Sequence, residues 1–245
     1  MPMPRSARLC AVATVAGAFY YPPLQAAAVW LAIAAAACAS APSAPVAAPA
    51  ALDATLADSV ERATAPRRPQ QVTFDWALTD RDARFSGKGV VRLAPPYRAR
   101  LDLFGPRGEA YVVAVLDGDA LRLAPAGANE LLPPAAFLWA SLGVFRRPAQ
   151  PLTLARRTGE GVELAYAAGS DRWRFNLGPD GLRQVEWQGP DGGRRTVELS
   201  GRAAPSVPQR GAFRDWVAFR ELTLTVTGVE DVDGFSEDIW TLGAR

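Results

Sequence analysis

An alternation of apolar and polar residues with a period of two runs through much of this chain and restricts what it can fold into. Every second residue is apolar or glycine over 72–78, 84–93, 172–177 and 222–227. Successive side chains of a strand point to opposite faces of a sheet, so each segment predicts a β-strand with one apolar and one solvated face.

Short turn sequences separate these segments. They are rich in Gly, Pro and Asp, which favour tight turns, and they lie at 79–82, 105–108, 117–119, 178–181 and 189–193. With 21 Gly and 21 Pro among 245 residues, short strands are favoured over long helices. We predict about ten strands joined mainly as antiparallel hairpins, which indicates a mainly β domain, either a sandwich or a barrel.

The segment 133–143 breaks the alternation and predicts a short helix. Two prolines open it and Gly143 ends it, positions where each residue type is well tolerated. The segment is apolar on nearly every side, so the helix must lie against or inside the sheet. Two interpretations stay open: a plug of the core, or a movable lid over a cavity.

The first 37 residues have the anatomy of an export signal. Arg5 and Arg8 form a positive segment, and two long apolar runs follow. The second run ends in Ala-Ala-Ala-Cys at 35–38, which resembles a lipobox, where the cysteine is acylated and the chain is cut before it. Residues 1–37 are predicted to be a lipoprotein signal peptide, with Cys38 as the lipidated residue. Plain cleavage without lipidation and an uncleaved anchor are the alternatives.

A tether rich in Ala, Pro and Ser is predicted for residues 38–70. Within it, Leu52, Leu56 and Val60 recur every four residues and predict a short helix ahead of the prolines at 66 and 69. The folded domain is predicted at 71–245.

Localisation is inferred from the residue after Cys38. Ala39 stands where the best-known sorting rule places the Asp that retains lipoproteins at the inner membrane. We therefore expect an outer-membrane lipoprotein of the bacterial envelope that faces the periplasm and is held to the membrane by its lipid anchor.

The residue types present argue against catalysis. The chain has no His, and its only cysteines, Cys10 and Cys38, precede the predicted domain. The domain therefore has no thiol nucleophile, no disulfide and no Cys/His zinc site. We predict no catalytic residues, no metal and no cofactor. The acidic stretch 230–238 matches the alternation of a calcium loop only in part, and solvated turns account for it.

The charge balance argues against nucleic acid as a partner. Arg5 and Arg8 are two of the 27 basic residues, and the remaining 25 equal the 25 acidic residues. Nucleic-acid-binding domains usually carry a basic excess. The arginine doublets at 146–147 and 156–157 are interpreted either as solvated charge or as contacts to anionic headgroups.

Taken in order, these features resemble the outer-membrane lipoprotein receptor (LolB-like) family of the bacterial lipoprotein-sorting pathway. The resemblance covers roughly residues 70–228. After the lipobox-like Cys38 and the tether, it runs through a strand pair that reaches 85–93, the segment 100–108 and the Pro-Pro-led helix with Trp139. It continues through the Trp-bearing strand 171–175 and the threonine-rich strand 222–227. It implies a monomeric antiparallel incomplete β-barrel (a half-barrel), curled over the short apolar helix, with a cavity for acyl chains.

The inward-facing side chains of such a half-barrel are the candidate lining of that cavity. They are Phe74, Trp76, Phe85, Val91, Leu101, Leu103, Tyr111, Val113, Phe137, Leu138, Leu142, Trp173 and Phe175. The same residues would equally fill an ordinary core, and the sequence leaves both interpretations open.

In that family an exposed leucine on a protruding loop inserts lipoproteins into the membrane. The matching loop here is Pro106, Arg107 and Gly108, so an arginine replaces the leucine and the insertion role is in doubt. We expect a lipid-anchored protein that binds acyl chains or lipidated lipoproteins, with a role in lipoprotein localisation. The alternative is a structural or assembly lipoprotein of the outer membrane with a filled core and a protein partner.

Overall fold

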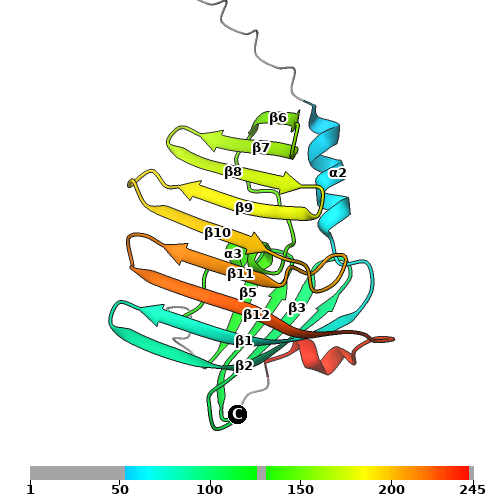
Figure 1. Ribbon diagram of the computed structural model, residues 1–245, viewed down its shortest axis with the longest axis vertical. Helices are drawn as coiled ribbons and strands as arrows, with labels where there is room; N and C mark the ends of the chain where they lie inside the picture. The colour runs from blue at the N-terminus through cyan, green and yellow to red at the C-terminus, as the bar shows by residue number, and fades with distance from the viewer. Residues whose placement is uncertain (1–52, 126–130, 243–245) are drawn as a thin grey trace, which may run out of the picture. The chain divides into compact units, whose positions relative to one another are not determined.

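The computed structural model describes residues 53–125 and 131–242, and they form one antiparallel sheet with short helices against it (Figure 1). The signal peptide, Cys38 and most of the tether lie outside the described residues and stay predictions. The helices are α2 (Ala54–Thr64), α3 (Ala135–Ser141) and the 3-10 helix η3 (Glu237–Trp240). The strands are β1 (Gln70–Asp80), β2 (Ala83–Ala94), β3 (Arg98–Phe104), β4 (Ala110–Asp117), β5 (Ala120–Ala124), β6 (Leu152–Thr158), β7 (Gly161–Ala168), β8 (Asp171–Gly178), β9 (Gly181–Gln188), β10 (Arg194–Ser200), β11 (Arg210–Asp215) and β12 (Arg220–Asp231).

From β1 the chain adds strands outward to one edge of the sheet, crosses to the other edge and adds strands back to β12. The strand order is β5-β4-β3-β2-β1-β12-β11-β10-β9-β8-β7-β6, so β1 and β12 pair in the middle. The segment containing α3 leads from one edge strand, β5, to the other, β6. Among the described strands these two edges do not pair with each other, so the sheet stays open. The predicted antiparallel half-barrel with a short apolar helix is confirmed, with twelve strands rather than about ten.

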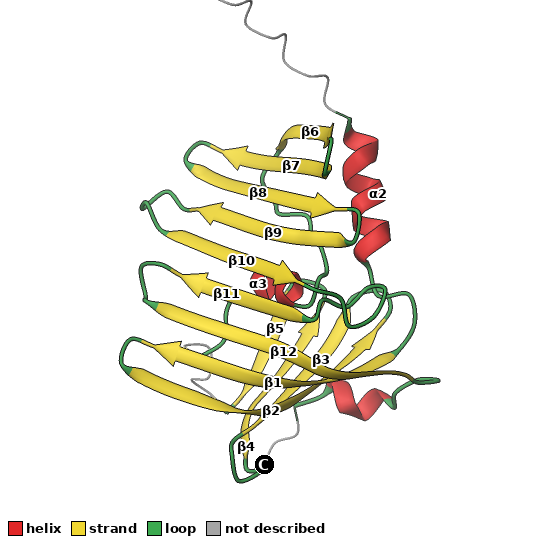
Figure 2. Ribbon diagram, in the orientation of Figure 1, coloured by secondary structure: helices red, strands yellow, loops and turns green. Residues whose placement is uncertain are grey.

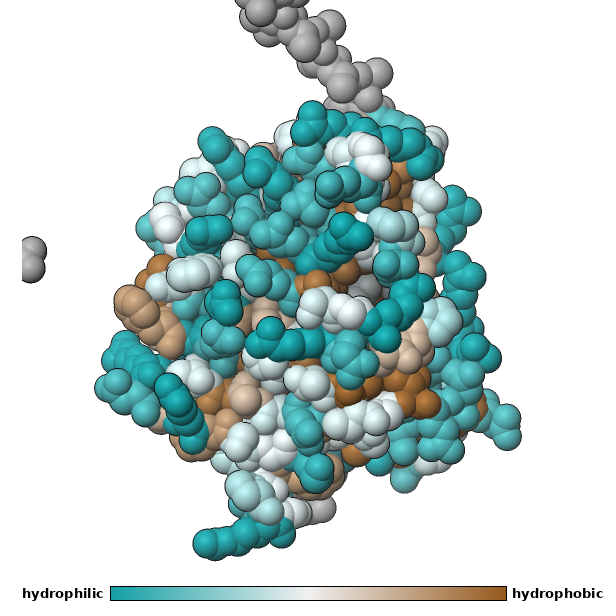
Figure 3. Space-filling view, in the orientation of Figure 1, coloured by the Kyte–Doolittle hydropathy of each residue, from teal (hydrophilic) through white to brown (hydrophobic). Residues whose placement is uncertain are grey.

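The period of two places the core on one face of the sheet. Along β1, the side chains of Val72, Phe74, Trp76 and Leu78 are buried, and those between them are half-buried or exposed. The opposite face carries ion pairs between neighbouring strands, such as Arg214 with Glu221 at 2.9 Å. Such exposed pairs contribute little stability, but their charged side chains make this face polar. The face is largely hydrophilic in Figure 3.

Helix α3 lies behind the sheet in Figure 2 and is buried from Phe137 to Ser141. It contacts β10 and β11. The ring of Phe137 stacks on Trp173 with centroids 5.0 Å apart, and the indole N–H of Trp139 donates to the carbonyl of Gly118 at 2.7 Å. In this structure α3 is therefore a plug of the core.

Helix α2 belongs to the folded domain, which begins earlier than residue 71. Its buried face, Leu56, Ala57, Val60 and Thr64, packs toward the sheet, and the helix contacts β6 and β9. The hydroxyl of Thr64 accepts a hydrogen bond from the Phe145 N–H at 3.1 Å. Of the four-residue apolar repeat, Leu56 and Val60 dock this helix on the sheet, and Leu52 lies outside the described residues.

Three of the four arginines in the two doublets form ion pairs within the described part of the chain. Arg147 forms ion pairs with Asp58 and Glu61 of α2, and Arg146 pairs with Asp119 at 3.0 Å. In the second doublet, Arg156 pairs with Glu163 across β6 and β7 at 2.6 Å. These contacts favour the interpretation of Arg146, Arg147 and Arg156 as structural surface charge, whereas Arg157 forms no such pair among the described residues.

The acidic C-terminal stretch contains residues that pack η3 against β3. Arg98 forms a bidentate pair with Glu237, both N–O distances being 3.0 Å, and Arg100 donates to the carbonyl of Ile239 at 2.6 Å. These bonds hold η3 and the buried Trp240 against β3. Within the described ranges no group of three potential ligands could hold a metal ion, and no helix there is long and apolar enough to span a bilayer.

Candidate functional site

Most of the predicted cavity residues pack against one another in the core. Nine of them are buried: Phe74, Trp76, Val91, Leu101, Leu103, Phe137, Leu138, Leu142 and Phe175. Tyr111 and Trp173 are partly buried and pack against these residues, and Phe85 is 38% exposed. The contact of these residues with acyl chains stays a prediction, but the inner face of the half-barrel is occupied by side chains and by α3.

Val113 lies on the other face from its predicted neighbours because of a β-bulge. The register between β3 and β4 shifts so that Leu103 pairs with Val112 and Phe104 with Ala110, which leaves Tyr111 as the extra residue. Tyr111 stacks on Trp76 at 5.3 Å, and the alternation restarts with Val112 buried. One inserted residue reverses the faces of those that follow, so Val113 is half-buried outside the core cluster.

A cleft of about 620 Å³ lies between α2, the ends of β6 to β10 and the loop 201–208. We call it the α2 cleft. Its lining is partly polar, with Ser59, Thr64, Ser200 and Ser206, and its apolar residues include Leu56, Val60, Ala63, Val162, Leu177, Leu182, Leu199 and Val207. None of the predicted cavity residues lines it. Figure 3 shows apolar surface between the hydrophilic side chains beside α2.

Small residues keep the α2 cleft open. Ser59 and Ala63, one turn apart on α2, line it with short side chains. Next to the lining residue Val162, the backbone of Gly161 approaches the carbonyl of Leu177 so closely that a Cβ there would lie 1.9 Å from the oxygen. Gly161 also has a φ of +150°, which side chains rarely tolerate. A glycine is therefore needed where β7 meets the end of β8.

Arginines surround the mouth of the α2 cleft. Arg157, Arg183 and Arg202 line it and are exposed, whereas Asp180 is the one acidic residue among its lining residues. Asp180 pairs with Arg202 at 2.9 Å, and neither Arg157 nor Arg183 forms an ion pair within the described part of the chain. An apolar floor with a positive rim suits an amphiphile that has a hydrocarbon chain and an anionic headgroup.

A second hollow, of about 520 Å³, lies at the opposite ends of β7, β8 and β9 and is lined by Trp173, Trp187 and Tyr166 among others. The Tyr166 hydroxyl is buried and finds no hydrogen-bond partner among the described residues. Burial raises the pKa of Tyr166 to about 12, although Arg147 opposes the shift. The hydroxyl is thus neutral near pH 7. Trp173 is the one predicted cavity residue that lines this hollow.

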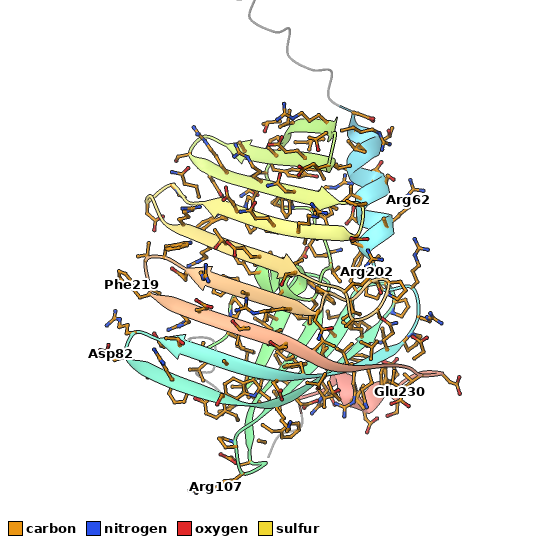
Figure 4. All side chains as sticks on the ribbon, viewed as in Figure 1. Arg62, Asp82, Arg107, Arg202, Phe219 and Glu230 are labelled. Atoms are coloured by element: carbon orange, nitrogen blue, oxygen red, sulfur yellow. The ribbon has the colours of Figure 1, made fainter. Side chains whose placement is uncertain are left out.

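The predicted protruding loop is an exposed turn between β3 and β4. Pro106, Arg107 and Gly108 are all exposed, and Arg107 points away from the sheet in Figure 4. The N–H of Arg107 donates to the Glu109 carboxylate at 2.9 Å, and Gly108 adopts a φ of +82°. This turn presents a guanidinium, which stays at the polar surface of a membrane rather than among acyl chains.

Comparisons with known proteins identify the fold. No protein-family model matches the chain, and no curated protein matches its sequence. Among solved structures it is similar to a LolA superfamily protein from Nitrosomonas europaea, with a TM-score of 0.51 and 12% identity over 77% of this chain and 96% of that one. A Vibrio parahaemolyticus domain described as an outer-membrane lipoprotein-sorting protein gives a TM-score of 0.46 and 10% identity, over 76% of this chain and 94% of that chain. The first of these likenesses shows a LolA-like fold.

Proposed function

We propose that this protein is an envelope lipoprotein that binds the acyl chain of an anionic amphiphile, or of a lipidated protein, in the α2 cleft. The observation that carries the proposal is the combination of an apolar floor with a rim of three arginines and one carboxylate. The protein has no catalytic role in this proposal and acts by binding.

The size of the α2 cleft supports a single chain of substantial length. Its volume of about 620 Å³ falls within the range of about 300–1,000 Å³ that is usual for small-molecule sites. Each buried methylene contributes about 0.8 kcal/mol, and association itself costs several kcal/mol. A ligand therefore needs on the order of ten methylenes to bind usefully, which favours a long-chain fatty acyl group over a short one.

We expect the arginines at the rim of the α2 cleft to contact the anionic headgroup of the ligand. Replacing both Arg157 and Arg183 by Glu should weaken the binding of a long-chain fatty acid about fivefold to tenfold, because each exposed charge is worth up to about 1 kcal/mol. Binding of the uncharged monoacylglycerol of equal chain length should change little. Competition against a fluorescent fatty acid measures both affinities.

The control for the rim is a double reversal elsewhere on the surface. Arg62→Glu with Arg107→Glu produces the same change in net charge at two exposed positions that do not line the α2 cleft. If this control weakened fatty-acid binding as much as the rim variant, the headgroup contact at the rim would be wrong.

The lipid anchor is tested separately. If Cys38 is acylated, the mature protein should partition into the membrane and detergent fractions, and Cys38→Ser should release it or leave it unprocessed. More than one acyl chain is generally needed for stable anchoring, and a triacylated N-terminus meets that need. A wild-type protein found wholly in the soluble periplasmic fraction would contradict the anchor.

The second candidate function is structural. The filled inner face, with nine predicted cavity residues and α3 in one core, favours an assembly lipoprotein with a protein partner. Mass spectrometry of the purified protein separates the two candidates. The acyl-binding proposal predicts co-purified lipid at up to one molecule per chain, and the structural candidate predicts a protein free of lipid that also fails to bind added fatty acid.

A further inference from the structure

Two neighbouring hairpins carry all the large hydrophobic side chains that are exposed in the described part of the chain. Trp216, Val217 and Phe219, at the turn between β11 and β12, are 48%, 64% and 72% exposed, and Phe85 of β2 is 38% exposed. We call the first three the aromatic tip. Figure 3 shows it as an apolar patch at the left edge, and in Figure 4 Phe219 points outward.

The two hairpin ends are joined. The N–H of Arg81, in the turn between β1 and β2, donates to the carbonyl of Phe219 at 3.1 Å. Arg220 forms an ion pair with Asp80 at 2.9 Å. The aromatic tip and the turn at 81–82 therefore form one continuous end of the sheet.

Packing does not explain the choice of phenylalanine at position 219. Its φ is +55°, in the left-handed region where glycine or asparagine is favoured. Its side chain is 72% exposed, so it gains little burial in return. A strained residue whose side chain is not buried points to a contact with another molecule.

Contacts of the Asp215 carboxylate fix the conformation of the aromatic tip. The carboxylate of Asp215 accepts hydrogen bonds from the N–H groups of Val217 and Ala218 at 3.1 and 3.0 Å, and it pairs with Arg195 at 2.7 Å. Burial opposes ionisation of Asp215, but these contacts outweigh it and lower its pKa. Presenting a preformed turn reduces the entropy lost on docking.

The charges beside the aromatic tip are mostly positive. Arg81 and Arg84 are exposed and form no ion pair within the described ranges, and Arg194 lies over the Trp216 ring at 5.5 Å. Asp82, between the first two, is the exposed acid of the same turn. Aromatic side chains flanked by arginines match the interface of a bilayer, where rings sit at headgroup depth and guanidinium groups meet phosphates.

We propose that the aromatic tip docks on the surface of a bilayer containing anionic phospholipid. Trp216, Val217 and Phe219 enter the headgroup region, and Arg81 and Arg84 contact phosphates. The tip and Arg202 of the α2 cleft lie on opposite sides of the domain in Figure 4. Docking therefore places Arg202, at the α2 cleft, away from the membrane.

The test uses the predicted mature chain, residues 38–245, carrying Cys38→Ser, so that neither an acyl anchor nor the apolar residues 1–37 contribute to binding. Cosedimentation is measured with vesicles of phosphatidylcholine alone and of phosphatidylcholine with phosphatidylglycerol in equal parts. We expect binding to the mixed vesicles, and Phe219→Asn should weaken it about fivefold to tenfold through the lost apolar contact. Asn accepts the left-handed backbone, so the melting temperature should stay the same or rise.

Two further variants and a fatty-acid binding assay serve as controls for the vesicle experiment. Ser170→Asn, in the exposed turn between β7 and β8, should leave vesicle binding unchanged. Arg81→Gln with Arg84→Gln should reduce binding to the mixed vesicles and leave the weaker binding to neutral vesicles unchanged. Phe219→Asn should retain fatty-acid binding, which separates this inference from the function proposed for the α2 cleft.

Equal vesicle binding by the parent and by Phe219→Asn, or no binding by the parent, would overturn the inference. A concentration-dependent dimer in sedimentation that Phe219→Asn abolishes, without vesicle binding, would assign the aromatic tip to a second copy of the chain instead.

Discussion

Replacing Phe137 by Asp is expected to unfold the domain. The ring is 2% exposed and packs on Trp173 at 5.0 Å and Phe213 at 5.3 Å. Removing a buried Phe side chain costs about 3–5 kcal/mol, and an unpaired buried carboxylate adds several kcal/mol more. This total is comparable to the whole stability of a typical domain, about 5–15 kcal/mol. Urea denaturation followed by circular dichroism measures the loss.

Ala136→Asp is the matched control for this variant. It places the same side chain in the first turn of α3, where Ala136 is half-buried and where the helix dipole favours negative charge. We expect it to fold with a small loss of stability. A Phe137→Asp variant that keeps the wild-type melting temperature and loses only ligand binding would mean that α3 is a movable lid.

Replacing Ser59 by Trp is expected to close the α2 cleft and to weaken fatty-acid binding at least about tenfold, or about 1.4 kcal/mol. Ser59 is exposed on α2 and lines the cleft, so the indole can occupy ligand space without entering the core. The melting temperature should change little, since surface substitutions usually alter stability by less than about 0.5 kcal/mol. Titration with a fluorescent fatty acid gives the affinity.

Arg62→Trp controls for adding an indole to the same helix. Arg62 is exposed, does not line the cleft and points to solvent in Figure 4, so this variant should bind fatty acid like the wild type. Equal affinity for Ser59→Trp and Arg62→Trp would place the ligand elsewhere.

The sheet could be predicted from the sequence because its signal is local. Alternation along β1 reports directly which side chains face the core, and Gly- and Pro-rich turns separate the strands. The bulge at Tyr111 could not be predicted in this way, because nothing in the run 110–117 departs from a continuous strand. Its consequence is that Val112 faces the core and Val113 does not.

The α2 cleft was missed for a different reason. Its lining comes from α2, five strands and the loop 201–208, which meet only after the chain has folded. The four-residue repeat at Leu56 and Val60 indicated a helix, but not the surface on which it packs. The aromatic tip was hidden because Trp216, Val217 and Phe219 look like part of an apolar strand. In the structure they form a turn between the end of β11 at Asp215 and the start of β12 at Arg220, with a left-handed φ at Phe219.

Photolabelling tests the binding of an acyl chain in the α2 cleft most directly. A long-chain fatty acid with a photoreactive group at its terminal carbon is bound to the purified protein and irradiated, and the labelled peptides are identified by mass spectrometry. We expect labels within 56–64, 177–183 and 199–208, which excess unlabelled fatty acid and Ser59→Trp both suppress. Saturable labelling of the inner face of β1 to β4 instead, or no saturable labelling at all, would contradict this proposal.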